Sequence, residues 1–157
     1  MFKTVLWATD GSETAARALP YALGLAEPDQ AKLVIAHVRE IFVGRGGGYP
    51  VLADESELRE QIGRQVNDLK EGGLDATFIV RTCTAGHAAR TIAEIAEEVG
   101  ADLIVAGTHG YGRVAGLLLG SVTQGLLHAG ICPVLAVPTG AVVETPEHEL
   151  ATSTATQ

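Results

Sequence analysis

The sequence predicts an α/β fold in which an open parallel sheet carries helices on both faces. Three observations support this prediction. Five short runs are apolar and β-rich, four stretches between them have a helical pattern, and the two kinds alternate along the chain. Strands that are joined through helices pair in parallel by right-handed crossovers. The chain has 157 residues, of which 46% are hydrophobic, so it is long enough for one domain with a substantial core.

The expected strands are apolar runs bounded by turn residues, and they cover residues 2–9, 31–38, 76–82, 102–106 and 133–137. The expected helices are bounded by capping residues and turns, and they cover residues 12–26, 54–70, 85–99 and 121–129. Ser12 is expected to cap the first helix. Pro20 should kink that helix, because proline removes one backbone hydrogen bond. Gly100 is expected to end the third helix.

The second helix, residues 54–70, is the most clearly amphipathic. Its apolar residues recur at intervals of four, four and three along one stripe, at Leu58, Ile62, Val66 and Leu69. Its charged residues, which include Glu55, are expected to form a solvated face. His37, a lone histidine in the second strand, is expected to pack rather than to take part in chemistry.

Two segments are expected to lack regular structure. Residues 39–52 contain Gly44-Arg45-Gly46-Gly47-Gly48 and Pro50, which predict a flexible connection. Arg39 and Arg45 could close over a ligand, although a plain mobile loop is the simpler expectation. Residues 139–157 have little apolar content and no periodicity, which predicts a disordered tail. The domain is therefore expected to cover residues 1–138.

Composition and charge exclude several classes of protein. The 19 acidic residues outnumber the 11 basic ones, which gives a net charge of −8, and no basic stripe for nucleic acid is visible. No signal-peptide layout is present, and no apolar run reaches the roughly 20 residues of a membrane span, so we expect a cytoplasmic protein without membrane contact. Cys83 and Cys132 lie far apart and fit neither a zinc nor a redox spacing, so buried thiols are expected.

One glycine-rich stretch carries the strongest functional signal. It follows the apolar run Leu103-Ile104-Val105-Ala106, has glycines at positions 107, 110, 112, 116 and 120, and leads into the helix that Ser121 opens. A glycine-rich turn before a helix presents unpaired N–H groups and the positive end of the helix dipole, which suit an anion. The residues alone are equally compatible with a plain turn. The stretch lacks the lysine of a P-loop, and its glycine spacing differs from the dinucleotide fingerprint.

The pattern Gly107-x2-Gly110-x9-Gly120-Ser121 resembles the nucleotide motif of the universal stress protein family, in its ATP-binding branch. The opening Val5-Leu6-Trp7-Ala8-Thr9-Asp10-Gly11-Ser12 and the later Cys132-Pro133-Val134-Leu135-Ala136-Val137-Pro138 are similar to the same family. The resemblance covers roughly residues 2–138. It implies a Rossmann-like fold of the adenine nucleotide alpha hydrolase-like kind, with five parallel strands in the order 3-2-1-4-5. In that order the first and fourth strands are neighbours, which brings Asp10 and Gly107 together where the winding of the sheet reverses.

The resemblance further implies a bound ATP, with Mg²⁺ or Mn²⁺. Adenine is assigned to the main chain around Val38, and ribose or metal to Asp10, although Asp10 is as compatible with a helix cap. The phosphates are assigned to the N–H groups of Gly110, Gly120, Ser121, Val122 and Thr123. His109 borders them in the family pattern, and a turn residue is an equal expectation. Arg113 could pair with phosphate. The implied nucleotide-binding residues are Ala8, Thr9, Asp10, Val38, Ala106, Gly107, His109, Gly110, Gly120, Ser121, Val122 and Thr123.

We expect a nucleotide-binding or signalling module of the stress response, with slow hydrolysis at most, because no base with a water-orienting partner can be identified. Two alternatives stay open: the same pocket could bind cAMP, or the protein could be a dimeric scaffold that uses no nucleotide. Group transfer through Ser121 lacks a His/Asp relay. The strand 133–137 is too apolar for an open sheet edge, so a homodimer is expected to form through it, as the resemblance also implies.

Overall fold

The computed structural model describes residues 1–44, 46–50, 55–110 and 119–140 of the chain. Within these ranges the strands of the sheet are β1 (Thr4–Ala8), β2 (Lys32–Gly44), β3 (Gly47–Pro50), β4 (Ala76–Thr84), β5 (Leu103–Gly107) and β6 (Val134–Val137). The helices are α1 (Glu13–Ala16), α2 (Leu19–Ala26), α3 (Glu55–Glu71), α4 (Ala88–Val99) and α5 (Ser121–Ala129), with a short 3-10 turn, η1, at Glu27–Asp29.

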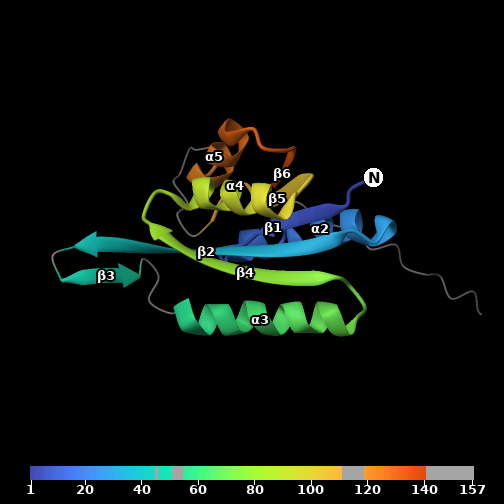
Figure 1. Cartoon of the computed structure of the whole chain (residues 1–157), viewed down its shortest axis with the longest axis horizontal. Helices are drawn as coiled ribbons and strands as arrows, with labels where there is room; N and C mark the ends of the chain where they lie inside the picture. Colours follow the sequence, from blue (N-terminus) through green and yellow to red (C-terminus); the bar gives the residue numbers. More distant parts are fainter. Residues whose placement is uncertain (45, 51–54, 111–118, 141–157) are drawn as a thin grey trace, which may run out of the picture.

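The five expected strands pair in parallel in the predicted order, which in the labels of the structure is β4-β2-β1-β5-β6. β1 lies at the centre, with Ala8 opposite Ala36 of β2 on one side and Ala106 of β5 on the other. The chain winds to one side of β1 through β2 and β4, then to the other through β5 and β6 (Figure 1). The winding therefore reverses between β1 and β5.

The expectation of a flexible connection over residues 39–52 is wrong for most of that segment. β2 continues to Gly44, and β3 pairs with its end in antiparallel register, from Ile41 opposite Pro50 to Gly44 opposite Gly47. This makes a sixth strand and a hairpin that projects beyond the rest of the sheet (Figure 1). Ile41, Phe42 and Val43 favour a strand, and Gly47, at φ +121°, supplies the backbone that the turn needs. Arg45 and residues 51–54 lie outside the described residues.

The expected first helix is divided into two helices instead of being kinked at Pro20. α1 ends at Ala16, and Pro20 lies in the first turn of α2, where the missing N–H costs no helical hydrogen bond. The side chain of Ser12 accepts a hydrogen bond from the backbone N–H of Ala15 at 3.2 Å, so Ser12 caps α1 as expected. At the break Ala16 is exposed and Ala18 is buried.

Helices cover both faces of the sheet. On one face α2 and α3 pack over Trp7, Leu33 and Ile35, and three members of the predicted stripe of α3, Leu58, Ile62 and Val66, are buried there. On the other face α4 and α5 pack over a second apolar cluster (Figure 1). α5 has the predicted bounds, and Gly100 ends α4 at φ +62° as predicted. No helix within the described ranges combines the length and the apolar character needed to cross a membrane.

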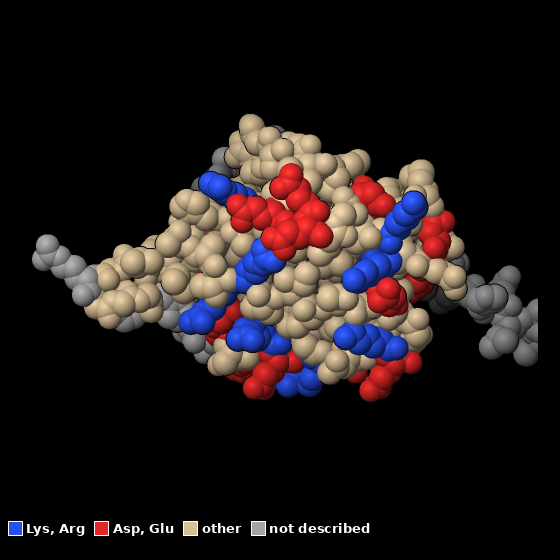
Figure 2. Space-filling model, in the orientation of Figure 1, with Lys and Arg blue, Asp and Glu red and all other residues tan. Residues whose placement is uncertain are grey.

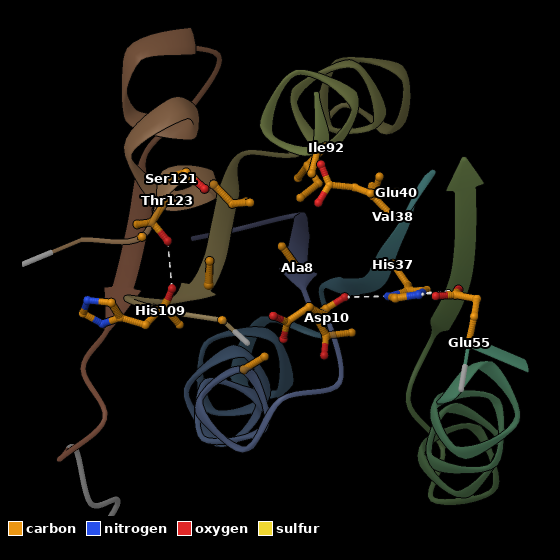
Figure 3. A pocket seen from close by; sticks show the side chains of 18 residues that line it. Ala8, Asp10, His37, Val38, Glu40, Glu55, Ile92, His109, Ser121 and Thr123 are labelled. Atoms are coloured by element: carbon orange, nitrogen blue, oxygen red, sulfur yellow. Dashed lines mark hydrogen bonds and ion pairs between the residues drawn. The ribbon is translucent and has the colours of Figure 1, made fainter. Parts of the chain in front are cut away.

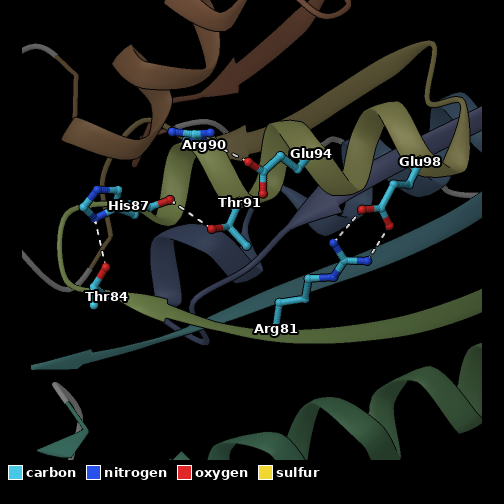
Figure 4. A network of polar contacts seen from close by, with 7 residues as sticks. All are labelled: Arg81, Thr84, His87, Arg90, Thr91, Glu94 and Glu98. Atoms are coloured by element: carbon cyan, nitrogen blue, oxygen red, sulfur yellow. Dashed lines mark hydrogen bonds and ion pairs between the residues drawn. The ribbon is translucent and has the colours of Figure 1, made fainter. Parts of the chain in front are cut away.

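Polar contacts fix α4 to the neighbouring strand β4 (Figure 4). The guanidinium of Arg81 on β4 donates two hydrogen bonds to the carboxylate of Glu98 on α4, one of them from Nη1 at 2.7 Å. This bonding lowers the pKa of the Glu98 carboxyl group and raises that of Arg81. At the start of α4 the hydroxyl of Thr91 donates to the carbonyl oxygen of His87 at 3.1 Å. Acidic and basic side chains are interspersed on the face shown in Figure 2.

The remaining predictions have mixed outcomes. Cys83 and Cys132 are free thiols, partly rather than fully buried, and burial raises the pKa of both. Of the predicted tail, residues 139–157, all but the first two residues lie outside the described residues, as does Arg113.

Candidate functional site

The carboxyl ends of β1 and β5 meet at the point where the winding of the sheet reverses. Ala8 and Ala106 are opposite each other, and the turns that follow them carry Asp10 and Gly110. These turns touch, because a Cβ atom added to Gly110 would overlap the carboxylate of Asp10. The predicted meeting of the early aspartate with the glycine stretch is therefore present in the fold. A crevice at such a reversal is where α/β sheets bind ligands.

A cavity of about 320 Å³ opens at this place (Figure 3). All twelve residues that the sequence predicts for nucleotide binding line it. Six further lining residues were missed, and they come from α1, α3, α4 and β2: Ala15, His37, Glu40, Glu55, Ala88 and Ile92.

The main chain of Val38 faces the cavity, and on that side its hydrogen-bonding groups have no partner among the described residues. Backbone N–H and C=O groups of a strand residue point to one side, and the side alternates along the strand. The carbonyl oxygen of Ala36 accepts from the N–H of Thr9 at 3.0 Å, so Val38, two residues later, presents its groups to the same side. There β1 has already ended, and no described residue pairs with Val38 on that side. One donor and one acceptor are left to a ligand.

The start of α5 forms a second wall with open backbone donors. Gly120 is the N-cap residue and no side chain caps the helix, so the N–H groups of Ser121, Val122 and Thr123 begin the helix without a capping partner among the described residues. The N–H of Gly120, however, donates to the carbonyl oxygen of Thr108 at 2.6 Å. The donor that the sequence analysis assigned to phosphate is thus already used within the fold.

The hydroxyl of Thr123 also has an internal partner. Thr123 is buried, and its Oγ1 donates to the carbonyl oxygen of Gly107 at 2.8 Å, which fastens α5 to the end of β5 (Figure 3). Ser121 is exposed at the rim of the cavity. Among the described residues, its hydroxyl hydrogen-bonds neither a histidine nor a carboxylate, so no relay for group transfer is present.

Asp10 lies in a turn and does not cap α1. Its Oδ1 accepts from the backbone N–H of Ser12 at 2.9 Å, and Ser12 itself supplies the cap. The neighbouring N–H of Gly11 donates to the hydroxyl of Thr9 at 3.1 Å. These bonds hold the carboxylate of Asp10 at the mouth of the cavity, beside Gly110.

Glu55 and His37 form a pair that the sequence analysis missed. Glu55 is buried rather than solvated, and its Oε1 lies 2.9 Å from Nε2 of His37, whose side chain is 1% exposed. Nδ1 of His37 lies 2.9 Å from the carbonyl oxygen of Thr9. His37 does pack in the core, as expected, but it packs through two polar contacts at the cavity wall (Figure 3). In the sequence, His37 is marked only by its position next to Val38. Glu55 is marked only as an acidic residue in the first turn of a helix.

Glu40 lies two residues beyond Val38, on the same face of β2, opposite Ile92 of α4 (Figure 3). Its Oε1 accepts from the backbone N–H of Gly86 at 2.7 Å. The period of two from Val38 is the signal that could have identified it. His109 is half-buried in the lining, with Nδ1 3.1 Å from the hydroxyl of Thr108.

The charged lining of the cavity is mainly acidic. Asp10, Glu40 and Glu55 contribute carboxylates, His37 and His109 contribute imidazoles, and the described lining contains no lysine or arginine. Arg39 is not part of it. An anionic ligand would therefore rely on backbone N–H groups and on a cation that accompanies it.

A resident metal site made by protein side chains alone is not found within the described ranges, where no three His, Cys, Asp or Glu residues come together suitably. One carboxylate and the phosphates of a ligand can nevertheless hold Mg²⁺, which keeps several of its waters. Asp10 at the cavity mouth fits that arrangement.

Comparison with known proteins identifies the family. The model of the universal stress protein family matches residues 1–138, and the chain belongs to this family. A universal stress protein of Thermus aquaticus is 34% identical over 140 residues, covering 87% of this chain and 99% of the relative. Universal stress protein YxiE of Bacillus subtilis is 33% identical over 147 residues, with the same coverages.

Solved structures agree with the fold. The structure of MJ0577, a universal stress protein of Methanocaldococcus jannaschii, matches with a TM-score of 0.63 and 25% identity, covering 90% of this chain and 99% of that one. A universal stress protein crystallised with cAMP matches with a TM-score of 0.61 and 29% identity, covering 87% of this chain and 97% of its own. The predicted family and the α/β fold class are thus confirmed.

Proposed function

We propose that this universal stress protein binds ATP in the cavity between β1 and β5 and serves in the cytoplasm as a nucleotide-binding module of the stress response. One observation carries the proposal. Main-chain groups without a partner among the described residues lie at two places on one cavity, at Val38 and at the start of α5, and the turn that carries Asp10 also lines it.

Adenine is assigned to the slot beside Val38. The Watson–Crick edge of adenine offers the N6 amino group as a donor and N1 as an acceptor, which match the carbonyl oxygen and N–H of Val38. Ile92 and Ala88 supply the apolar wall that a base requires. The main chain can make this match with any side chain at position 38, and a valine there adds to the apolar surface.

The phosphates are assigned to the N–H groups of Ser121, Val122 and Thr123, with Gly110 on the facing turn. The positive end of the α5 dipole favours negative charge at that place. Asp10 is assigned to the ribose or to Mg²⁺ or Mn²⁺ bound with the phosphates. The acidic lining supports a metal-bound nucleotide, because a bare triphosphate would face three carboxylates without a described lysine or arginine.

Hydrolysis is proposed to be slow at most. Fast phosphoryl transfer to water requires a residue that orients the attacking water and a group that stabilises the charge of the transition state. Within the described lining, His37 and Glu55 are engaged with each other, and Ser121 has no activating partner. Binding is therefore the main activity proposed here.

Binding of cAMP is the second candidate, and it is favoured by one specific observation. A relative that is 29% identical to this chain was crystallised with cAMP. A cyclic monophosphate carries a single negative charge and would need no metal beside Asp10. A dependence of binding on Mg²⁺ therefore separates the two candidates.

The test is calorimetric titration with ATP and with cAMP, each with and without Mg²⁺, together with mass spectrometry of nucleotide carried through a gentle purification. A ligand present at 1,000 times its Kd stabilises the fold by about 4 kcal/mol. For a chain of this length, 1 kcal/mol raises Tm by about 2–4 °C. ATP that binds only with Mg²⁺ supports the proposal. Absence of both nucleotides and of any melting shift would favour the nucleotide-free scaffold.

We also propose a homodimer that forms through β6. β6 pairs with β5, and within the described part of the chain its other edge has no partner. Val134, Leu135 and Ala136 are only half-buried there. Apolar edges of this kind are commonly covered by another strand, and a second copy of β6 is the simplest cover. Light scattering at micromolar concentration measures the mass that decides this proposal.

A further inference from the structure

His37 and Glu55 form a buried polar link that the proposed contacts to ATP do not use. His37 lies on β2 with 1% of its side chain exposed, and Glu55 is the first residue of α3. Nε2 of the ring lies 2.9 Å from Oε1 of Glu55, and Nδ1 lies 2.9 Å from the carbonyl oxygen of Thr9 (Figure 3). One side chain therefore connects β2, α3 and the turn that follows β1.

The chemistry of these contacts fixes one proton. A carbonyl oxygen only accepts hydrogen bonds, so Nδ1 of His37 must carry a proton in order to donate to Thr9. A second proton lies between Nε2 and the carboxylate of Glu55, on one atom or the other. In either case both ring nitrogens are satisfied, which a buried imidazole requires. Removal of Glu55 would leave Nε2 of His37 without its partner.

The residue that His37 holds begins the turn that carries Asp10. The N–H of Thr9 donates to Ala36, and its carbonyl oxygen accepts from His37, so both main-chain groups of Thr9 are fixed to β2. The hydroxyl of Thr9 accepts from the N–H of Gly11. The position of Asp10 therefore depends on a residue whose orientation His37 determines.

The same turn also rests directly on α3. Gly11 has φ +78°, and a Cβ atom there would overlap the side chain of Leu58, one turn along α3 from Glu55. The first turn of α3 thus contacts the Asp10 turn twice, through Leu58, which packs on Gly11, and through Glu55 by way of His37. A shift of the start of α3 would move both contacts together.

We infer that His37 is a positioning residue for the nucleotide site, held by Glu55, and that it sets the Thr9–Asp10 turn for ligand binding. This inference rests on the proposed function, since it concerns affinity for ATP. It assigns no contact between His37 and the ligand. The inference predicts that affinity for MgATP falls when the hydrogen bond between His37 and Glu55 is broken. It also predicts that affinity recovers when an uncharged side chain restores that hydrogen bond.

The test compares Glu55→Ala with Glu55→Gln, using calorimetric titration of the full chain with MgATP. Glu55→Ala should weaken binding about tenfold, because the loss of one buried hydrogen bond frees His37 and the turn that it holds. Glu55→Gln keeps a hydrogen-bonding partner for Nε2 and should stay within about threefold of the original affinity. His37→Ala combined with Glu55→Ala should bind no more weakly than His37→Ala alone, since the two residues act as one unit.

Val66→Ala is the matched control. Val66 is buried in α3 and does not line the cavity, so this change weakens the packing of the same helix and leaves the link intact. Its MgATP affinity should be unchanged. Wild-type affinity in folded Glu55→Ala and His37→Ala proteins would overturn the inference. So would an equal loss in Val66→Ala, which would show that the effect is general destabilisation.

Amide hydrogen exchange and ¹⁵N spectroscopy of the ring give readouts that need no nucleotide. Glu55→Ala should speed exchange at Gly11 and Ser12, whose N–H groups bond within the turn, and Val66→Ala should not. The ¹⁵N shifts of His37 should show a protonated Nδ1. If the protein binds no ATP but these signals change as stated, the proposed function fails and the positioning of the turn stands. Unchanged exchange, or a bare Nδ1, overturns the positioning role itself.

Discussion

Substitution of Gly120 tests most directly whether the turn after β5 and the start of α5 hold the phosphates. Gly120 has φ −68° and ψ 159°, a conformation that every residue adopts, so a side chain here causes no backbone strain. The cost is steric. A Cβ atom would lie 3.1 Å from the carbonyl oxygen of Thr108 and 3.3 Å from Cα of His109, so the facing turn must move by a few tenths of an ångström.

Two opposing effects set the expected stability of Gly120→Ala. Crowding of a packed site costs about 1–3 kcal/mol. Replacement of glycine by alanine at a compatible conformation returns about 0.4–1 kcal/mol through the unfolded state. The net loss is therefore about 1 kcal/mol, or about 2–4 °C in Tm. Gly120→Val adds bulk to the same contact and should destabilise further, so alanine is the more informative change.

The affinity of the folded Gly120→Ala protein for MgATP should also fall, for a reason separate from its lower stability. The new methyl group narrows the phosphate seat and displaces the turn that carries the N–H of Gly110, so MgATP binding should weaken about tenfold, equivalent to 1.4 kcal/mol. Calorimetric titration measures the affinity, and guanidinium unfolding measures the stability of the same sample.

Gly63→Ala is the matched control for this experiment. Gly63 lies inside α3, and a Cβ atom there meets nothing within 4 Å, so this change should raise stability by about 0.5–1 kcal/mol and leave binding unchanged. If folded Gly120→Ala and Gly120→Val proteins bind MgATP within twofold of the original, the phosphates are placed wrongly.

Three further predictions concern other parts of the fold. Thr123→Val should lower the free energy of unfolding by about 1–3 kcal/mol, because the carbonyl oxygen of Gly107 loses its donor; Thr123→Ser should lose less in chemical denaturation, and equal losses would contradict the role of the hydroxyl. Ala136→Pro should convert the dimer to a monomer in light scattering without unfolding it, because the carbonyl oxygens of Pro133 and Val137 face β5 and the N–H of Ala136 therefore faces outward; a dimer that persists, while Ala136→Ser also stays dimeric, would exclude β6 as the interface. Iodoacetamide at pH 8 should modify both cysteines more slowly than free cysteine and faster as the pH rises, because burial raises the thiol pKa values and leaves less thiolate; rates equal to free cysteine would contradict this.

The hairpin of β2 and β3 shows where sequence reasoning failed on the fold. Glycines at positions 44 and 46–48 are as common in loops as in hairpin turns, and the composition favoured a loop. The apolar run from Ile41 to Val43 forms a strand because Gly47 allows the chain to return along it in register. Such pairing is decided between segments, whereas composition reports each segment alone.

In the candidate site, too, local patterns could be identified from the sequence and contacts between distant segments could not. Gly110 and Gly120 could be identified as site residues because their spacing is a local pattern. The use of the Gly120 N–H by Thr108 could not be identified, since that contact spans a stretch whose path the sequence does not reveal. Likewise, the spacing of α3 predicts its apolar stripe, but nothing local shows that Glu55 meets His37, a residue 18 positions earlier.

By itself, the sequence determined the alternation of strands and helices, the bounds of α5, the cap at Gly100, and twelve of the residues that gather at the cavity. These features follow from turn chemistry, periodicity and motif spacing, which act over a few residues. Only the tertiary structure decided which backbone donors have no partner among the described residues, at Val38 and in the first turn of α5, and which, such as the N–H of Gly120, are used within the fold. The physical reason is that a polar group is satisfied by whatever lies beside it in space, and for these groups the neighbours come from distant parts of the chain.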